Sequence, residues 1–197
     1  MALILVVCTG NVCRSPIAEG CLRASMKRRL DSQAPFVSSA GTAGWEGSEA
    51  MPESIRAAAE RGVEIGSHVA RRLTSAMIAD ADLIVAMARE HADAVAAGAP
   101  DAVTRTFTLK ELVRLLEALP PPNTSSPNGL AARVVEADRL RGNGFEGNVH
   151  DEDVSDPLGL PLGAFRAIAW ELDTWCERLA DGLFGHLADS GRVEEEG

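Results

Sequence analysis

An unbroken apolar run, Leu3 to Val7, stands near the start of the chain and leads directly into a short loop and a helix start. Its branched residues are typical of a strand buried on both faces, because such a strand needs apolar side chains on both sides. After the loop, Ser15 can cap a helix and Pro16 suits its first position. A doubly buried strand followed by a helix favours a parallel sheet covered by helices on both faces.

The same alternation of strands and helices continues along the chain. Further strands are expected over 36–39, 83–87 and 103–107, and helices over about 16–30, 52–61, 74–80, 89–97, 108–119 and 162–185. We therefore predict an α/β fold with a four-stranded parallel sheet in the order 2-1-3-4. This order reverses at the carboxyl end of the first strand, where open parallel sheets place their ligands.

One domain over residues 1–190 fits the length of 197 residues. A stretch rich in proline, asparagine and serine at 120–129 begins an insertion over about 120–150, which we expect to be flexible. Within it, 130–140 is compatible with a short helix, and 142–152 has the composition of a mobile loop. Residues 191–197 are expected to be a disordered tail.

The composition excludes several functions. A net charge of −10 argues against nucleic-acid binding. The apolar run is too short to span a bilayer and lacks the basic flank of a signal peptide, so we expect a cytoplasmic protein with no membrane partner. The four cysteines form no metal-binding spacing, so we expect free thiols, no metal and no cofactor.

The loop itself has the pattern of an anion site. Five residues separate Cys8 from Arg14, and the backbone N–H groups between them can converge at a helix start. Arg14 offers a planar fork for two phosphoryl oxygens, and the same positive field favours a reactive Cys8 thiolate. We predict that phosphate or another oxyanion binds to the loop residues Thr9, Gly10, Asn11, Val12, Cys13, Arg14 and Ser15.

The stretch CTGNVCRSPIAE, Cys8 to Glu19, resembles the signature of the low-molecular-weight protein tyrosine phosphatase family. The similarity extends through Ser38–Thr42, His68–Arg71, Ala81–Met87 and Asp156-Pro157, and it covers residues 2–119 and about 150–185. The resemblance implies a small four-stranded parallel fold. It also implies hydrolysis of phosphotyrosine in proteins or peptides through a cysteinyl-phosphate intermediate.

Leaving-group departure in this chemistry needs a carboxylic acid. Asp151, Glu152, Asp153 and Asp156 are all candidates, and the resemblance favours Asp156 because the family places its acid in an Asp-Pro pair. The resemblance further implies a hydrogen bond from Ser15 to the Cys8 thiolate, with Asn11, Ser15, Ser39 and His68 holding the loop. It also implies an aromatic cleft wall at Trp45.

Other positions near the loop suggest regulation and a cleft of unusual composition. Cys13 is a candidate redox partner that forms a disulfide with Cys8 under peroxide. Leu158 follows the Asp-Pro pair, where many relatives carry aromatic residues, so the opposite wall lacks a ring.

Several alternatives remain open. The stretch Phe107 to Glu111, with glycine soon after Asp156-Pro157, is similar to the bacterial branch that includes protein arginine phosphatases. Those carry threonine where this chain has Val12, which favours phosphotyrosine over phosphoarginine. An arsenate reductase is disfavoured because residues 77–110 lack cysteine. Two alternatives belong to other classes of protein. One is a thiol redox protein that uses Cys8 and Cys13, and the other is a phosphate-binding module without catalysis.

Overall fold

The computed structural model describes residues 2–122, 129–145 and 152–186. Four parallel strands form one sheet in the order β2-β1-β3-β4, which confirms the predicted topology. The strands are β1 (Leu3–Cys8), β2 (Phe36–Gly41), β3 (Leu83–Ala86) and β4 (Thr106–Thr108). The helices are α1 (Arg14–Leu30), α2 (Pro52–Ala59), α3 (Ser75–Asp80), α4 (Arg89–Gly98), α5 (Leu109–Glu117), α6 (Gly129–Gly142) and α7 (Leu162–Phe184), with short 3-10 turns η1 (Asp31–Gln33) and η2 (Pro100–Arg105).

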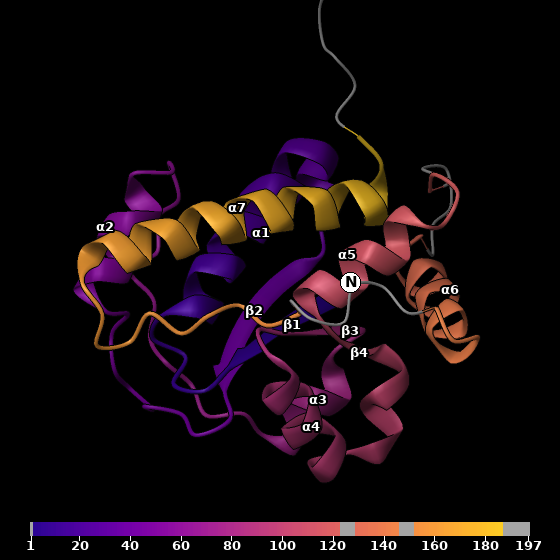
Figure 1. Cartoon of the computed structure of the whole chain (residues 1–197), viewed down its shortest axis with the longest axis horizontal. Coiled ribbons are helices and arrows are strands. Elements are labelled where there is room, and N and C mark those ends of the chain that lie inside the picture. The colour runs from indigo at the N-terminus through magenta and orange to yellow at the C-terminus, as the bar shows by residue number, and fades with distance from the viewer. Residues whose placement is uncertain (1, 123–128, 146–151, 187–197) are drawn as a thin grey trace, which may run out of the picture.

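Helices cover both faces of the sheet, with α1, α5 and α7 on one side and α3 and α4 on the other (Figure 1). Alternate residues of β1 divide between the two sides. Ile4 and Val6 belong to the larger core beneath α1, α5 and α7. Leu5 and Val7 belong to the smaller core against α3 and α4. This is why β1 reads as a continuous apolar run.

Two local predictions are wrong. Residues 103–105 belong to the 3-10 turn η2, and the fourth strand begins only at Thr106. Pro100 suits the first position of such a turn, and the Arg105 guanidinium donates to the carbonyls of Ala81 and Ile78, which attaches this segment to the end of α3. Ser15 is not a helix cap either.

The first helix begins at Arg14, one residue before Ser15, and no side chain caps it. The Ser15 hydroxyl lies 2.9 Å from the Cys8 sulfur. The hydroxyl that was expected to cap the helix therefore contacts the loop cysteine instead. A cap of the predicted kind does occur at α5. There the Thr108 hydroxyl accepts from the Glu111 N–H, and Glu111 accepts from the Thr108 N–H.

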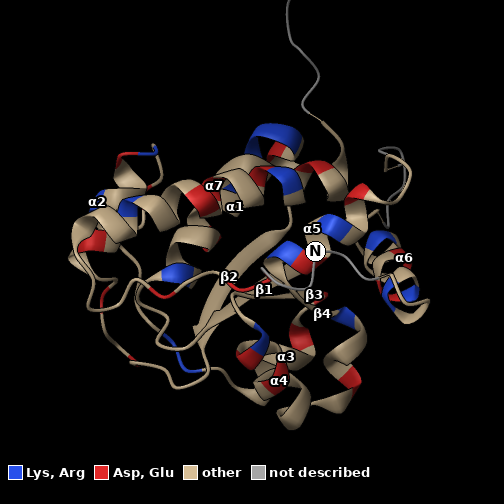
Figure 2. Ribbon diagram, in the orientation of Figure 1, with Lys and Arg blue, Asp and Glu red and all other residues tan. Residues whose placement is uncertain are grey.

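The middle of the predicted insertion forms α6, which packs against α5 through buried Leu130, Val134 and Ala137. The predicted tail at 191–197 lies outside the described residues. Within the described part of the chain, no helix is both long and apolar enough to cross a bilayer. Basic and acidic positions are interspersed over the outer helices (Figure 2), and Arg29 of α1 pairs with Glu177 and Asp181 of α7.

Candidate active site

The loop between β1 and α1 wraps around the sulfur of Cys8. This sulfur lies 2.9 Å from the Ser15 hydroxyl, and the backbone N–H of Asn11 donates to it at 3.3 Å. Asn11 adopts a left-handed φ of 58°, which turns the chain inward and which asparagine tolerates better than most residues. The loop therefore surrounds the sulfur with polar groups.

Close packing against the end of β2 fixes the outer side of the loop. The N–H groups of Thr42 and Ala43 donate to the carbonyls of Cys8 and Thr9 at 2.9 and 3.0 Å. A Cβ at Gly41 would lie 2.5 Å from the Thr9 carbonyl oxygen, so only glycine fits there.

Asn11 is the centre of the hydrogen-bond network behind the loop. Its side-chain amide donates to the Ser15 and Ser39 hydroxyls at 2.9 and 2.8 Å. Its side-chain oxygen accepts from the Arg71 N–H at 2.8 Å, and its carbonyl lies 2.8 Å from His68 Nε2. The structure thus brings together the four residues proposed to hold the loop.

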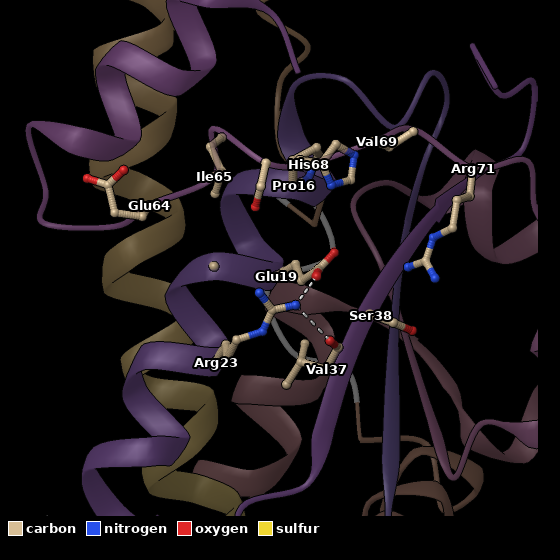
Figure 3. A pocket seen from close by; sticks show the side chains of 12 residues that line it. Pro16, Glu19, Arg23, Val37, Ser38, Glu64, Ile65, His68, Val69 and Arg71 are labelled. Carbon is tan, nitrogen blue, oxygen red and sulfur yellow. Dashed lines mark hydrogen bonds and ion pairs between the residues drawn. The ribbon is translucent and has the colours of Figure 1, made fainter. Parts of the chain in front are cut away.

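A polar pocket of about 390 Å³ lies beside this network, with Glu19, His68 and Arg71 in its lining (Figure 3). Glu19 accepts a 2.6 Å hydrogen bond from the Ser39 hydroxyl, and Arg23 bridges Glu19 and the Val37 carbonyl. Burial lowers the pKa of His68, which favours a neutral ring. With a neutral ring, the bond to the Asn11 carbonyl requires that Nε2 carry the proton.

Arg14 meets the proposed acid across the mouth of the loop. One terminal nitrogen donates to the Val154 carbonyl at 3.1 Å. The other donates to the Asp156 carboxylate at 2.6 Å and to the Thr9 hydroxyl at 3.2 Å. The Arg14 side chain is 4% exposed and that of Asp156 is 40% exposed, so the acid sits at the solvent side of a buried cation.

The neighbouring carboxylates have other partners. Glu152 pairs with Arg89 and with Arg114, and Asp153 accepts from the Arg89 N–H at 2.7 Å. The fourth candidate, Asp151, lies outside the described residues. Of the three described carboxylates, only Asp156 contacts Arg14.

The proposed cleft walls flank the loop. The backbone N–H of Trp45 donates to the Gly10 carbonyl at 3.2 Å, and the residue is 47% exposed. Leu158 is 42% exposed, and its N–H donates to Asp156. Val12 belongs to the main core and is 2% exposed, so its side chain serves packing.

Cys13, the last loop residue before α1, is a buried free thiol. Burial raises its pKa to about 11, against the lowering effect of a hydrogen bond with Ser54. Its role as a redox partner of Cys8 stays a prediction. Among the described residues, no group of three or more histidine, cysteine or acidic side chains is arranged to hold a metal ion.

Three residues of this site were not assigned by the sequence. Glu19 and Arg71 stand inside the recognised stretches, at the end of CTGNVCRSPIAE and of His68–Arg71, so their motifs carried a signal that was not used. His91 at the start of α4 belongs to no motif, and its Nε2 lies 2.9 Å from the Thr9 hydroxyl. Only the folded chain reveals that contact, because 82 positions separate the two residues.

Comparison with known proteins gives consistent results. Residues 3–132 match the family described as low molecular weight phosphotyrosine protein phosphatase. A protein-arginine-phosphatase of Geobacillus stearothermophilus is 32% identical over 180 residues, covering 91% of this chain and 95% of that protein. The low molecular weight protein-tyrosine-phosphatase Etp of Escherichia coli K12 is 40% identical over 123 residues, covering 62% of this chain and 78% of Etp.

Solved structures agree with these matches. The YwlE arginine phosphatase from Geobacillus stearothermophilus is 32% identical with a TM-score of 0.68, covering 93% of each chain. The tyrosine phosphatase amsI of Erwinia amylovora is 26% identical with a TM-score of 0.66, covering 93% of this chain and 94% of that one. With its cysteine loop, its sheet order and these matches, the chain belongs to the low molecular weight phosphotyrosine protein phosphatase family.

Proposed function

We propose that the protein hydrolyses phosphotyrosine in proteins or peptides, with Cys8 as nucleophile, Arg14 as phosphoryl-binding residue and Asp156 as general acid. The observation that carries this proposal is the contact between Arg14 and Asp156 above the loop that holds the Cys8 sulfur. The loop supplies a nucleophile and a cation, and a proton donor from a distant part of the chain contacts that cation, as phosphoryl transfer requires.

The reaction proceeds in two displacements. The Cys8 thiolate attacks phosphorus, the bond to the tyrosyl oxygen breaks, and Asp156 gives its proton to that oxygen. The Asp156 carboxylate then takes a proton from water, whose oxygen attacks the cysteinyl-phosphate. Phosphate leaves and the Cys8 thiolate is restored, while Arg14 and the loop N–H groups bind the phosphoryl oxygens throughout.

Phosphoarginine is the second candidate substrate, and two observations support it. The relative that aligns over 91% of this chain is a protein-arginine-phosphatase. In addition, Glu90 lies at the rim of the loop, with a carboxylate oxygen 3.3 Å from His91 Nε2. Two carboxylates near the loop, Asp156 and Glu90, suit a cationic guanidinium better than a neutral phenol ring.

The test is phosphate release from matched phosphotyrosine and phosphoarginine peptides, measured with EDTA present and with Cys8→Ser as control. Faster release from phosphotyrosine is expected, and Cys8→Ser is expected to abolish turnover. Faster release from phosphoarginine would replace the first candidate with the second. Turnover by Cys8→Ser would overturn the assignment of the nucleophile.

Glu90→Gln separates the two substrates further. If phosphoarginine is the substrate, the loss of this carboxylate is expected to lower kcat/KM for phosphoarginine about tenfold, the value of one charge-assisted contact, and to leave phosphotyrosine nearly unchanged. Equal effects on both peptides would exclude a role for Glu90 in guanidinium binding.

A further inference from the structure

His91 is a buried polar residue that the chemistry above does not use. It lies in the first turn of α4 and is 1% exposed. Its Nε2 is 2.9 Å from the Thr9 hydroxyl and 3.3 Å from a Glu90 carboxylate oxygen. The buried imidazole therefore contacts a side chain of the phosphate-binding loop.

The Thr9 hydroxyl is shared between two partners. It accepts from Arg14 at 3.2 Å and lies within hydrogen-bond distance of His91 Nε2. His91 is therefore connected through one oxygen to the cation that binds the phosphoryl group. Among the described residues, α4 is thus linked to the phosphate-binding loop through the Thr9 hydroxyl oxygen.

The surroundings of His91 determine where its proton lies. The Glu90 carboxylate next to Nε2 can only accept, which favours a proton on Nε2. Nδ1 is buried and has no partner among the described residues, so this tautomer leaves a lone pair there instead of an unpaired N–H. Burial, and then the charge of Arg14, lower the pKa of His91 to about 4, while Glu90, Asp156 and Asp153 oppose this shift. The ring is neutral at physiological pH.

A neutral ring with its proton on Nε2 donates to Thr9. The two lone pairs of the Thr9 oxygen then accept from His91 and Arg14, and its own O–H is left to donate into the site. We propose that His91 is a positioning residue, which orients the Thr9 hydroxyl so that it holds Arg14 and donates to a phosphoryl oxygen of the substrate. This inference rests on the proposed role of the loop in binding that group.

The test is a double-mutant cycle between His91→Leu and Thr9→Val in the full chain. The readouts are kcat and KM for para-nitrophenyl phosphate and the affinity for inorganic phosphate as a competitive inhibitor. Each single change is expected to weaken phosphate binding and kcat/KM about tenfold, the value of one hydrogen bond to a charged group. The double variant is expected to behave like Thr9→Val alone, because His91 acts through Thr9.

Two controls separate positioning from general damage. His91→Gln, whose amide reaches the position of Nε2, is expected to recover most of the phosphate affinity. Alkylation of Cys8 by iodoacetamide at a fixed pH is expected to keep its rate in His91→Leu, since His91 does not contact the sulfur network. If His91→Leu fails to fold, His91→Asn, whose amide ends short of Thr9, replaces it.

Outcomes that overturn the inference differ from those that overturn the function. Effects of the two changes that multiply, or no rescue by His91→Gln, would show that His91 supports the fold and not Thr9. Unchanged phosphate affinity in His91→Leu would also overturn the inference. Absence of turnover in the wild type would instead overturn the proposed function.

Discussion

At the scale of single residues, the chemistry depends on contacts between side chains that are distant in sequence. Arg14 and Asp156 are 142 positions apart and join at 2.6 Å. The Asp-Pro pair indicated Asp156 only through the family resemblance, because the residues alone left four acidic candidates. His91 could not be found at all, since a histidine on a helix gives no sign of what its ring contacts.

Asp156→Asn is expected to remove the proton donor and keep the shape of the side chain. Aryl phosphates with poor leaving groups are expected to slow by roughly 10²–10⁴, because proton transfer contributes that much, while those with good leaving groups slow far less. A leaving-group series of kcat values measures this. An equal loss across the series would assign the acid to another residue.

His91 also makes stability depend on pH. Its pKa falls from 6.5 to about 4 on folding, so the unfolded chain binds more protons between these values. The contribution of His91 to the free energy of unfolding is expected to be fully present above about pH 6.5. Below that pH, the free energy of unfolding is expected to fall by up to about 1.4 kcal/mol per pH unit towards pH 4.

Denaturant unfolding of the wild type and His91→Gln across pH 4 to 7 measures the difference between the two proteins. His68, whose pKa also falls through burial, adds the same trend to both and cancels in the comparison. Parallel curves for the two proteins would contradict the buried neutral ring.

At the scale of elements, the patterns of apolar residues predicted the strands whose position depends on burial. The run Leu3 to Val7 became β1, one of the two inner strands, and both of its sides are covered. The strand expected at 103–107 shifted to Thr106–Thr108, since Pro100 and the carbonyl contacts of Arg105 favour a 3-10 turn. Apolar composition does not reveal such side-chain contacts.

Gly41→Ala tests the contact between the end of β2 and the loop. The added methyl group would lie 2.5 Å from the Thr9 carbonyl and 3.0 Å from the Asn11 nitrogen, so the loop has to move. A displacement of about 1 Å at a reacting group is expected to lower kcat/KM on the order of 10²-fold. Steady-state kinetics measure the loss.

Gly66→Ala is the matched control, because a Cβ there meets no atom within 4 Å. It is expected to change the free energy of unfolding by less than about 0.5 kcal/mol and to keep wild-type kinetics. Wild-type kinetics in Gly41→Ala would show that the loop tolerates the displacement.

At the scale of the whole molecule, the predicted insertion contains a helix, α6, that lies away from the loop. Beside α5 in Figure 1, α6 is attached through Arg133, which is 5% exposed. The Arg133 guanidinium donates to the carbonyls of Leu116, Pro120 and Gly182, and so connects α5, the segment after it and α7. The breaker-rich sequence at 120–129 indicated an interruption, but composition could not predict how a buried arginine attaches the helix behind it.

Arg133→Leu is expected to lower the free energy of unfolding by about 2–4 kcal/mol, because three carbonyls lose their donor. Activity of the folded fraction is expected to stay at the wild-type level. Chemical denaturation and steady-state kinetics provide the two measurements. Arg139→Leu, an exposed position on the same helix, is the control and is expected to cost less than about 0.5 kcal/mol.

In the ion pair between Arg14 and Asp156, a carboxylate of the protein occupies the guanidinium that the substrate's phosphoryl group has to bind. An incoming oxyanion has to displace a carboxylate that is tethered beside Arg14 at a high effective concentration, so weakly charged anions are rejected first. After the second displacement Asp156 carries the proton that it took from water, so its ion pair with Arg14 forms again only after phosphate has left and that proton has been lost. The return to the resting arrangement thus follows product release and needs the loss of a proton from Asp156, the proposed general acid.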